Sequence, residues 1–149
     1  MKKMKLLVCA VLVASLVMGI AVAGSQSVSA KTKKVSTVII KMTNKKISYK
    51  KIANAKEYLG SDDWGESLIG IGKTKKVKIA KKCKFYRINF KKGPKSYCKI
   101  SKKKLIKLLK GDLKPAKETE KGKTFYAAVA FTLTIKKGKV VKVKEIYEP

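Results

Sequence analysis

The sequence predicts a mainly β domain with one short helix, preceded by an N-terminal export signal. Large apolar residues other than Tyr126 fall on every second position across residues 125–135, and a weaker alternation follows across residues 139–145. This period of two is typical of strands that bury one face. Residues 101–111 place apolar side chains at helical spacing, and a long uncharged run follows the first lysines. A chain of 149 residues has room for one such domain and a targeting segment.

The N-terminus has the three parts of a secretory signal peptide. Lysines at positions 2, 3 and 5 precede an apolar run at residues 6–23, and the small residues that follow end in Val28-Ser29-Ala30. We expect cleavage before Lys31. The alternative is an uncleaved membrane anchor, because the run is about as long as the shortest spanning helix of about 18 residues.

The chain is therefore expected to consist of a signal peptide at residues 1–30 and a single small β-barrel domain at residues 31–149. The expected location is secreted or cell-wall associated, or N-terminally membrane-anchored if the signal stays attached. Membrane contact is expected only through this segment, and only if it is not cleaved.

The domain begins with two expected strands. Residues 37–42 alternate in polarity, a turn signal lies at residues 44–45, and a second run starts at Ile47. Residues 49–60 fit either a longer second strand or a short helix that Gly60 ends.

The segment at residues 60–72 differs in composition from the rest of the domain. It contains Asp62, Asp63, Trp64 and Glu66 among several glycines. An exposed Trp beside carboxylates is a candidate carbohydrate-binding loop or a weak cation site. The alternative is a flexible connection whose Trp packs on the domain. The spacing of the acids lacks the alternating ligands of a Ca²⁺ loop, so no metal site is predicted.

A third strand is expected at residues 75–90, with a bend or bulge at residues 80–82. Gly93-Pro94 is a turn signal, so residues 96–100 are expected to pair back along this strand.

Cys83 and Cys98 flank that turn. They are the two cysteines that remain once residues 1–30 are removed. An even number of cysteines in an exported chain predicts a disulfide, which would close a loop of about 15 residues and stabilise the domain by roughly 3 kcal/mol. A metal or catalytic role is the weaker alternative, because the chain contains no His and no C-x-x-C spacing.

Residues 101–111 predict a helix, with Ser101 as N-cap and Gly111 just past its end. Its apolar face consists of Leu105, Ile106, Leu108 and Leu109. We expect this face to pack on the core, and membrane binding by a basic amphipathic helix is the alternative.

The first turn of this helix carries Lys102, Lys103 and Lys104. Positive charge opposes the helix dipole there unless an anion is bound. These three lysines are therefore candidate anion-binding residues.

A polar linker is expected at residues 112–123, and a β-hairpin at residues 125–147. Lys137-Gly138 lies between the two arms and supplies the positive φ of a tight turn.

The order strand, strand, long strand, helix, strand, strand predicts a small OB-like antiparallel barrel that the helix caps, and an open antiparallel sheet packed on one helix is the alternative. Three segments carry a resemblance across residues 35–147: VKIAKKCKFY, ISKKKLIKLLKG and FTLTIKKGKVVKVKEIY. They resemble small Lys-rich OB-like barrel proteins that Gram-positive bacteria export with a signal peptide. The resemblance implies ligand binding across the second and third strands and assigns no catalytic residues.

Charge is the strongest indication of a partner. Removal of residues 1–30 lowers the formal net charge only from +29 to +26. Such a surface attracts polyanions and responds to salt. Arg87 is the only arginine, and lysine lacks the bidentate geometry that recognises bases, so sequence-specific nucleic-acid binding is not expected. The alternative is that the lysines reflect a compositional habit and form a solvated surface.

Taken together, these features predict an exported, cationic, non-enzymatic domain that associates electrostatically with anionic polymers of the cell envelope. Catalysis needs a nucleophile or proton carrier held beside an activating group, and no motif supplies one; no cofactor is expected. The alternatives are a carbohydrate-binding module that uses Trp64 and a membrane-active cationic protein.

Overall fold

The computed structural model describes residues 31–148. The expected signal peptide, residues 1–30, lies outside this part of the chain. The described residues from Thr32 onward belong to one compact unit.

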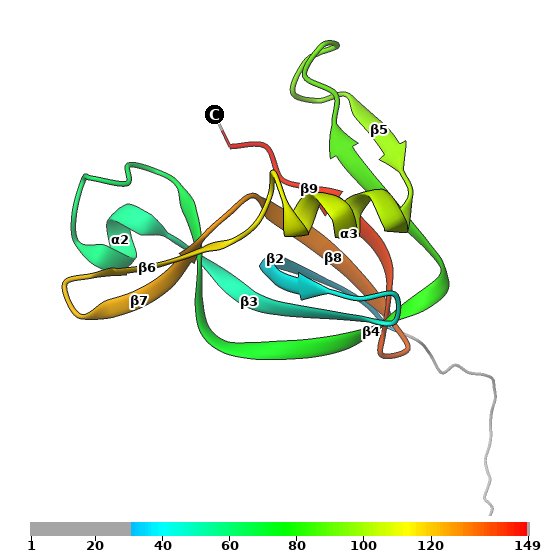
Figure 1. The fold of residues 1–149 in the computed structure, drawn as a ribbon, viewed down its shortest axis with the longest axis horizontal. Helices are drawn as coiled ribbons and strands as arrows, with labels where there is room; N and C mark the ends of the chain where they lie inside the picture. Colours follow the sequence, from blue (N-terminus) through cyan, green and yellow to red (C-terminus); the bar gives the residue numbers. More distant parts are fainter. Residues whose placement is uncertain (1–30, 149) are drawn as a thin grey trace, which may run out of the picture. The chain divides into compact units, whose positions relative to one another are not determined.

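This unit is mainly β, as predicted, with eight strands and two short helices among the described residues (Figure 1). In chain order the elements are β2 (Thr32–Met42), β3 (Lys46–Asn54), α2 (Ala55–Leu59), β4 (Leu68–Ile88), β5 (Tyr97–Ile100), α3 (Lys102–Lys110), β6 (Ala116–Glu120), β7 (Lys123–Ala127), β8 (Ala130–Lys136) and β9 (Lys139–Glu145).

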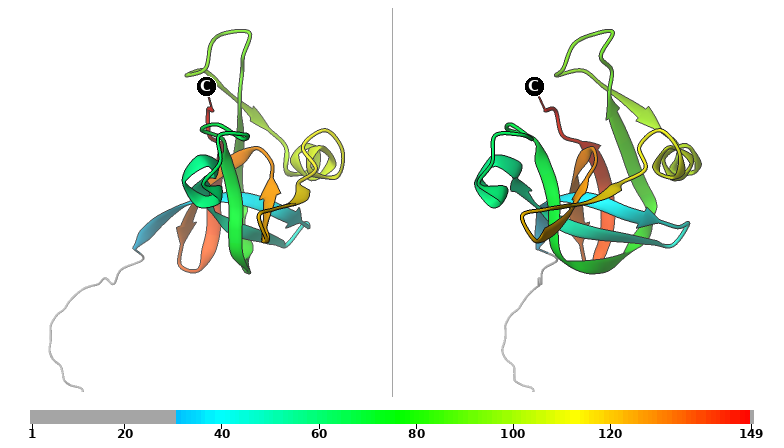
Figure 2. Two further views of the ribbon diagram at one scale, coloured as in Figure 1. Left: turned by 90° about the vertical axis from the view of Figure 1, so that its left-hand side faces the viewer. Right: turned by 60° about the vertical axis from the view of Figure 1, so that its left-hand side comes forward.

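All eight strands belong to one mixed sheet in the order β3-β2-β8-β9-β4-β7-β6, with β5 paired to β4. β4 and β9 are parallel, and the other pairs are antiparallel. β3 also pairs with β4, so the pairings pass from β3 through β2, β8, β9 and β4 and return to β3. The strands are accordingly strongly curved, and α3 lies beside them (Figure 2).

The main core lies between the curved strands and α3. Leu105 and Leu109 are 1% and 7% exposed and pack with Phe131, Leu133 and Val143. The expected core packing of this helix is confirmed for Leu105, Ile106 and Leu109, whereas Leu108 lies outside this core and on the exposed side of the helix. Ser101 is its N-cap, because its side chain accepts from the backbone N–H of Lys104 at 3.1 Å.

A second, smaller cluster joins α2, β4 and β7. Its buried members are Ala55, Leu59, Ile69 and Phe125. The expected polar linker at residues 112–123 is wrong, because it contains β6, which forms a hairpin with β7. The turn of this hairpin has positive φ at both Lys121 and Gly122, 50° and 76°.

The predicted first arm at residues 125–135 is divided between two strands. Phe125 lies on β7 in the second cluster, whereas Phe131 lies on β8 in the main core. Only the hairpin of β8 and β9 is confirmed. Its turn has φ of 53° at Lys137 and 75° at Gly138, as a two-residue turn of type I′ requires.

Both alternatives for residues 49–60 are realised in part. β3 continues to Asn54, whose side chain accepts from the N–H of Glu57 at 3.2 Å and starts α2. Gly60 ends this helix with a left-handed φ of 65°.

β4 begins earlier than predicted, inside the segment that was expected to be a loop. Gly70 permits this, since a Cβ there would lie 2.9 Å from Cβ of Val38 on β2. The predicted irregularity near residues 80–82 is present as a register shift against β9 between Ile79 and Lys84. β5 pairs back along the end of β4, also as predicted.

Candidate functional site

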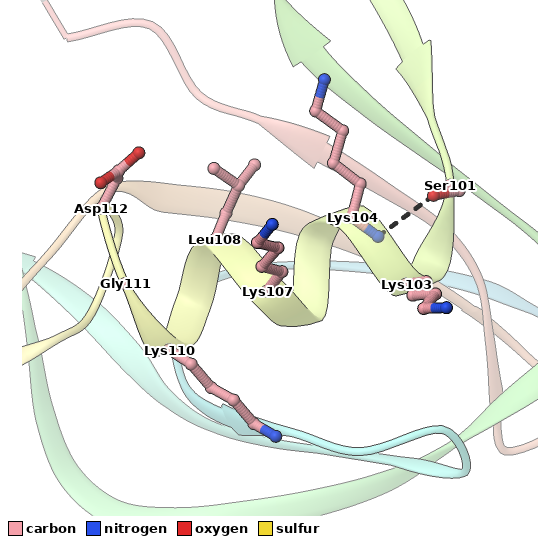
Figure 3. Close-up of a pocket in the computed structure, with 8 residues that line it drawn as sticks. All are labelled: Ser101, Lys103, Lys104, Lys107, Leu108, Lys110, Gly111 and Asp112. Atoms are coloured by element: carbon pink, nitrogen blue, oxygen red, sulfur yellow. Dashed lines mark hydrogen bonds between the residues drawn. The ribbon is translucent and has the colours of Figure 1, made fainter.

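The exposed side of α3 forms a basic, open groove of about 640 Å³ (Figure 3). Its lining residues are Ser101, Lys103, Lys104, Lys107, Leu108, Lys110, Gly111 and Asp112. The side chains of Lys104 and Lys110 extend in opposite directions (Figure 3). The lysines of α3 therefore spread around the helix and do not converge on one point.

The three candidate anion-binding lysines have different environments. Lys102 donates from Nζ to the backbone oxygen of Asn44 at 2.8 Å and so holds the turn between β2 and β3. Lys103 and Lys104 are exposed and line the groove. Only these two are placed to meet an anion in the groove.

The candidate ligand loop uses its Trp and one acid to hold the fold. Trp64 packs edge-on against Phe125 with ring centroids 5.2 Å apart, and its Nε1 donates to Oε1 of Glu120 at 2.6 Å. Glu66 accepts from Nδ2 of Asn54 at 2.9 Å. These contacts join the loop to β3, β6 and β7.

Asp62 forms an exposed ion pair with Lys56 at 3.2 Å, and the backbone N–H of Asp63 donates to Oγ of Ser61. Asp63 is exposed. Within residues 31–148, no three His, Cys, Asp or Glu side chains gather as a metal site would need. The loop acids therefore act singly.

The predicted disulfide between Cys83 and Cys98 is not formed, and both are free thiols. The register explains this: Cys98 lies opposite Arg87, four residues along β4 from Cys83. At about 3.3 Å per residue this offset places the two Cα atoms well beyond the roughly 7 Å that a disulfide spans.

The two thiols also differ in environment. Cys83 packs against the main core, and this burial raises its pKa to about 11 against a weaker opposing effect of Lys102. Cys98 is exposed. A thiol with a raised pKa is a poor nucleophile at neutral pH, because the thiolate is the reactive form.

A buried ion pair, not anticipated from the sequence, joins β4 to β9. Glu145 accepts from Nε of Arg87 at 2.9 Å, from Nη2 at 3.4 Å, and from the N–H of Ile88 at 3.0 Å. Its side chain is 5% exposed. Three donors thus satisfy a carboxylate that would otherwise be costly to bury.

Acidic side chains are segregated from most of the sheet. Glu145 is the only acid on β2, β3, β4, β8 and β9 together. The other described acids are Glu57, Asp62, Asp63, Glu66, Asp112, Glu118, Glu120 and Glu148. The outer face of these five strands therefore carries lysines and no exposed acid.

Comparisons of the chain with protein families, with curated proteins and with solved structures find no match. Among the described residues, no helix is both long enough and apolar enough to cross a bilayer.

Proposed function

We propose that the chain is an exported, cationic, non-enzymatic protein whose domain associates electrostatically with anionic polymers of the cell envelope. The observation that carries this proposal is the distribution of charge. A formal net charge of +29 is combined with five neighbouring strands whose single acid is buried and paired. Because no exposed acid on these strands neutralises the lysines, a polyanion is the complementary partner.

We further propose an OB-like arrangement for the domain. Its support is the circuit of pairings among the long strands, which in chain order are β2, β3, β4, β8 and β9. The pairings run β2-β3-β4-β9-β8 and close from β8 back to β2, so the order is first, second, third, fifth, fourth. The parallel pair of β4 and β9 and the position of α3 between β4 and β8 fit that topology. The hairpin of β6 and β7 is an addition to it.

The non-enzymatic part of the proposal is supported by the roles of the candidate groups. Glu145, Glu66 and Glu120 each accept hydrogen bonds that join elements of the fold. Cys83 is half-buried, and burial suppresses its thiolate. The three glutamates are thus accounted for by contacts within the fold.

Fractionation of the producing cell tests the proposal. We expect the protein in the envelope fraction at low salt and its release by a wash of increasing NaCl, because ionic contacts are screened. Retention that does not change with salt, or complete recovery in a low-salt medium, would contradict it.

A further inference from the structure

Four exposed lysines on four different strands lie in direct cross-strand register. Lys46 on β3 pairs with Lys78 on β4, Lys78 pairs with Lys139 on β9, and Lys139 pairs with Lys136 on β8. We refer to these four residues as the lysine row. Directly opposed residues point to the same face of a sheet, so the row crosses one face of the curved strands.

A second row lies beside it. Lys84 pairs with Lys142, and the buried Thr134 separates Lys142 from Lys34. The register between β8 and β9 changes next to Val141. This irregularity keeps both Lys139 and Lys142 exposed while Val140 and Val143 are fully buried, so the two rows share the outer face.

Like charges directly opposite one another destabilise a sheet. The lysine row contains three such contacts in succession and no acid between them. Nothing in the packing of the core requires lysine at these exposed positions. A bound polyanion would neutralise the row and convert the repulsion into attraction.

We propose that the lysine row binds a flexible, linear, phosphate-rich polyanion. This inference rests on the function proposed above and assigns it a site. Neighbouring strands are about 4.8 Å apart, so the backbone positions of the four lysines form a track of roughly 15 Å, from which the side chains reach outward. A chain with a charge every few ångströms can follow this track, and lysine ammonium groups bind phosphate as point charges without demanding one orientation.

The curvature of the strands favours a flexible partner over a duplex. The row runs across the outside of the pairing circuit, where the surface is convex. Duplex DNA is stiff over about 150 base pairs and would meet such a surface at few phosphates. The groove of α3 contains no such row, because its lysines extend around one short helix, with Lys104 and Lys110 in opposite directions (Figure 3).

Two variants that each lose four positive charges distinguish binding at a defined site from a general effect of net charge. The row variant replaces four lysines by glutamine: Lys46→Gln, Lys78→Gln, Lys136→Gln and Lys139→Gln. The helix variant makes the same change on α3: Lys103→Gln, Lys104→Gln, Lys107→Gln and Lys110→Gln. Each is purified from cells that express the full chain, and its affinity for inorganic polyphosphate is measured over a series of NaCl concentrations.

We expect the row variant to lose about tenfold or more in affinity, and the slope of log affinity against log salt to fall in magnitude by roughly 3, since each phosphate contact contributes roughly 0.7–0.9. The helix variant should change that slope by less than about 1. Equal losses in the two variants would overturn the assigned site and leave the proposed function standing. No salt-dependent binding by the unaltered protein would overturn both.

Two controls complete the test. The row variant should melt at the same temperature as the unaltered protein or higher, because repulsion is removed, and polyphosphate should raise the melting temperature of the unaltered protein but not that of the row variant. A version with arginine at the same four positions should retain binding. Polyglutamate and duplex DNA serve as competing probes. If the row variant loses as much affinity for polyglutamate as for polyphosphate, the preference for phosphate is wrong. If it loses as much affinity for duplex DNA, the preference for a flexible partner is wrong.

Discussion

Arg87 donates from Nε to Oε1 of Glu145 over 2.9 Å, and the carboxylate is almost fully buried. The only arginine in a lysine-rich chain is thus part of the fold and not of the cationic surface. Its planar guanidinium reaches both carboxylate oxygens, which a lysine ammonium cannot match. The pair fixes β9 to β4 at the end of the sheet that is remote from the lysine row.

Replacing Arg87 by alanine tests this role. Removal of one partner leaves a buried carboxylate without its charge partner, so we expect Arg87→Ala to lower the free energy of unfolding by about 3 kcal/mol. Urea unfolding measures the change. Lys99→Ala, at an exposed position on β5, is the matched control and should change stability by less than about 0.5 kcal/mol. Similar values for the two variants would show that the pair contributes little.

The free thiols make a second prediction. In the native protein at pH 8, iodoacetamide should label Cys98 rapidly and Cys83 slowly, because a pKa of about 11 leaves roughly one thiolate in a thousand at Cys83. The rate at Cys83 should rise about tenfold per pH unit until the pH approaches 11. Peptide mass spectrometry after labelling reports both residues. A peptide linked through both sulfurs would restore the disulfide and contradict the register of β4 and β5.

The contacts of Trp64 give a third prediction. Since its ring packs on Phe125 and its N–H binds Glu120, we expect Trp64→Ala to destabilise the domain by about 3 kcal/mol. Trp64→Phe keeps a ring and loses the hydrogen bond, so its cost should be about 1–2 kcal/mol. A carbohydrate-binding Trp would give the opposite result, in which Trp64→Ala abolishes glycan binding and leaves the unfolding midpoint unchanged.

Features with local signals were predicted well from the sequence. Ser101 and the apolar spacing that follows it identify α3, and Lys137-Gly138 identifies the hairpin of β8 and β9. Within that hairpin the bulge was missed, because Val140, Val141 and Val143 are chemically alike and only the partner strands decide that Val141 is not fully buried.

Features that depend on distant pairings were not predicted. The sequence of β6, AKETE, has almost no buried position and hence no apolar alternation to detect. The disulfide failed because the connection between β4 and β5 sets a register that two cysteines flanking a turn do not reveal. The lysine row joins residues 46, 78, 136 and 139, and only the strand pairings bring them together.

The close approach of β2 and β4 at Gly70 gives a final prediction. A Cβ at this position would lie 2.9, 3.3 and 3.4 Å from the three side-chain carbons of Val38, and both residues are buried. Gly70→Ala should therefore overpack the site and destabilise the domain by about 1–3 kcal/mol. Val38→Ala alone should also destabilise, by about 2 kcal/mol, because it leaves a cavity.

The double variant decides whether these two effects have one cause. If the new methyl group fills the space that Val38→Ala vacates, the double variant should be more stable than the sum of the single changes by about 1 kcal/mol or more. Thermal and urea unfolding of all four proteins supply the double-mutant cycle. Additive effects would mean that the two strands do not meet at this point, and that Gly70 serves the bend of β4 instead.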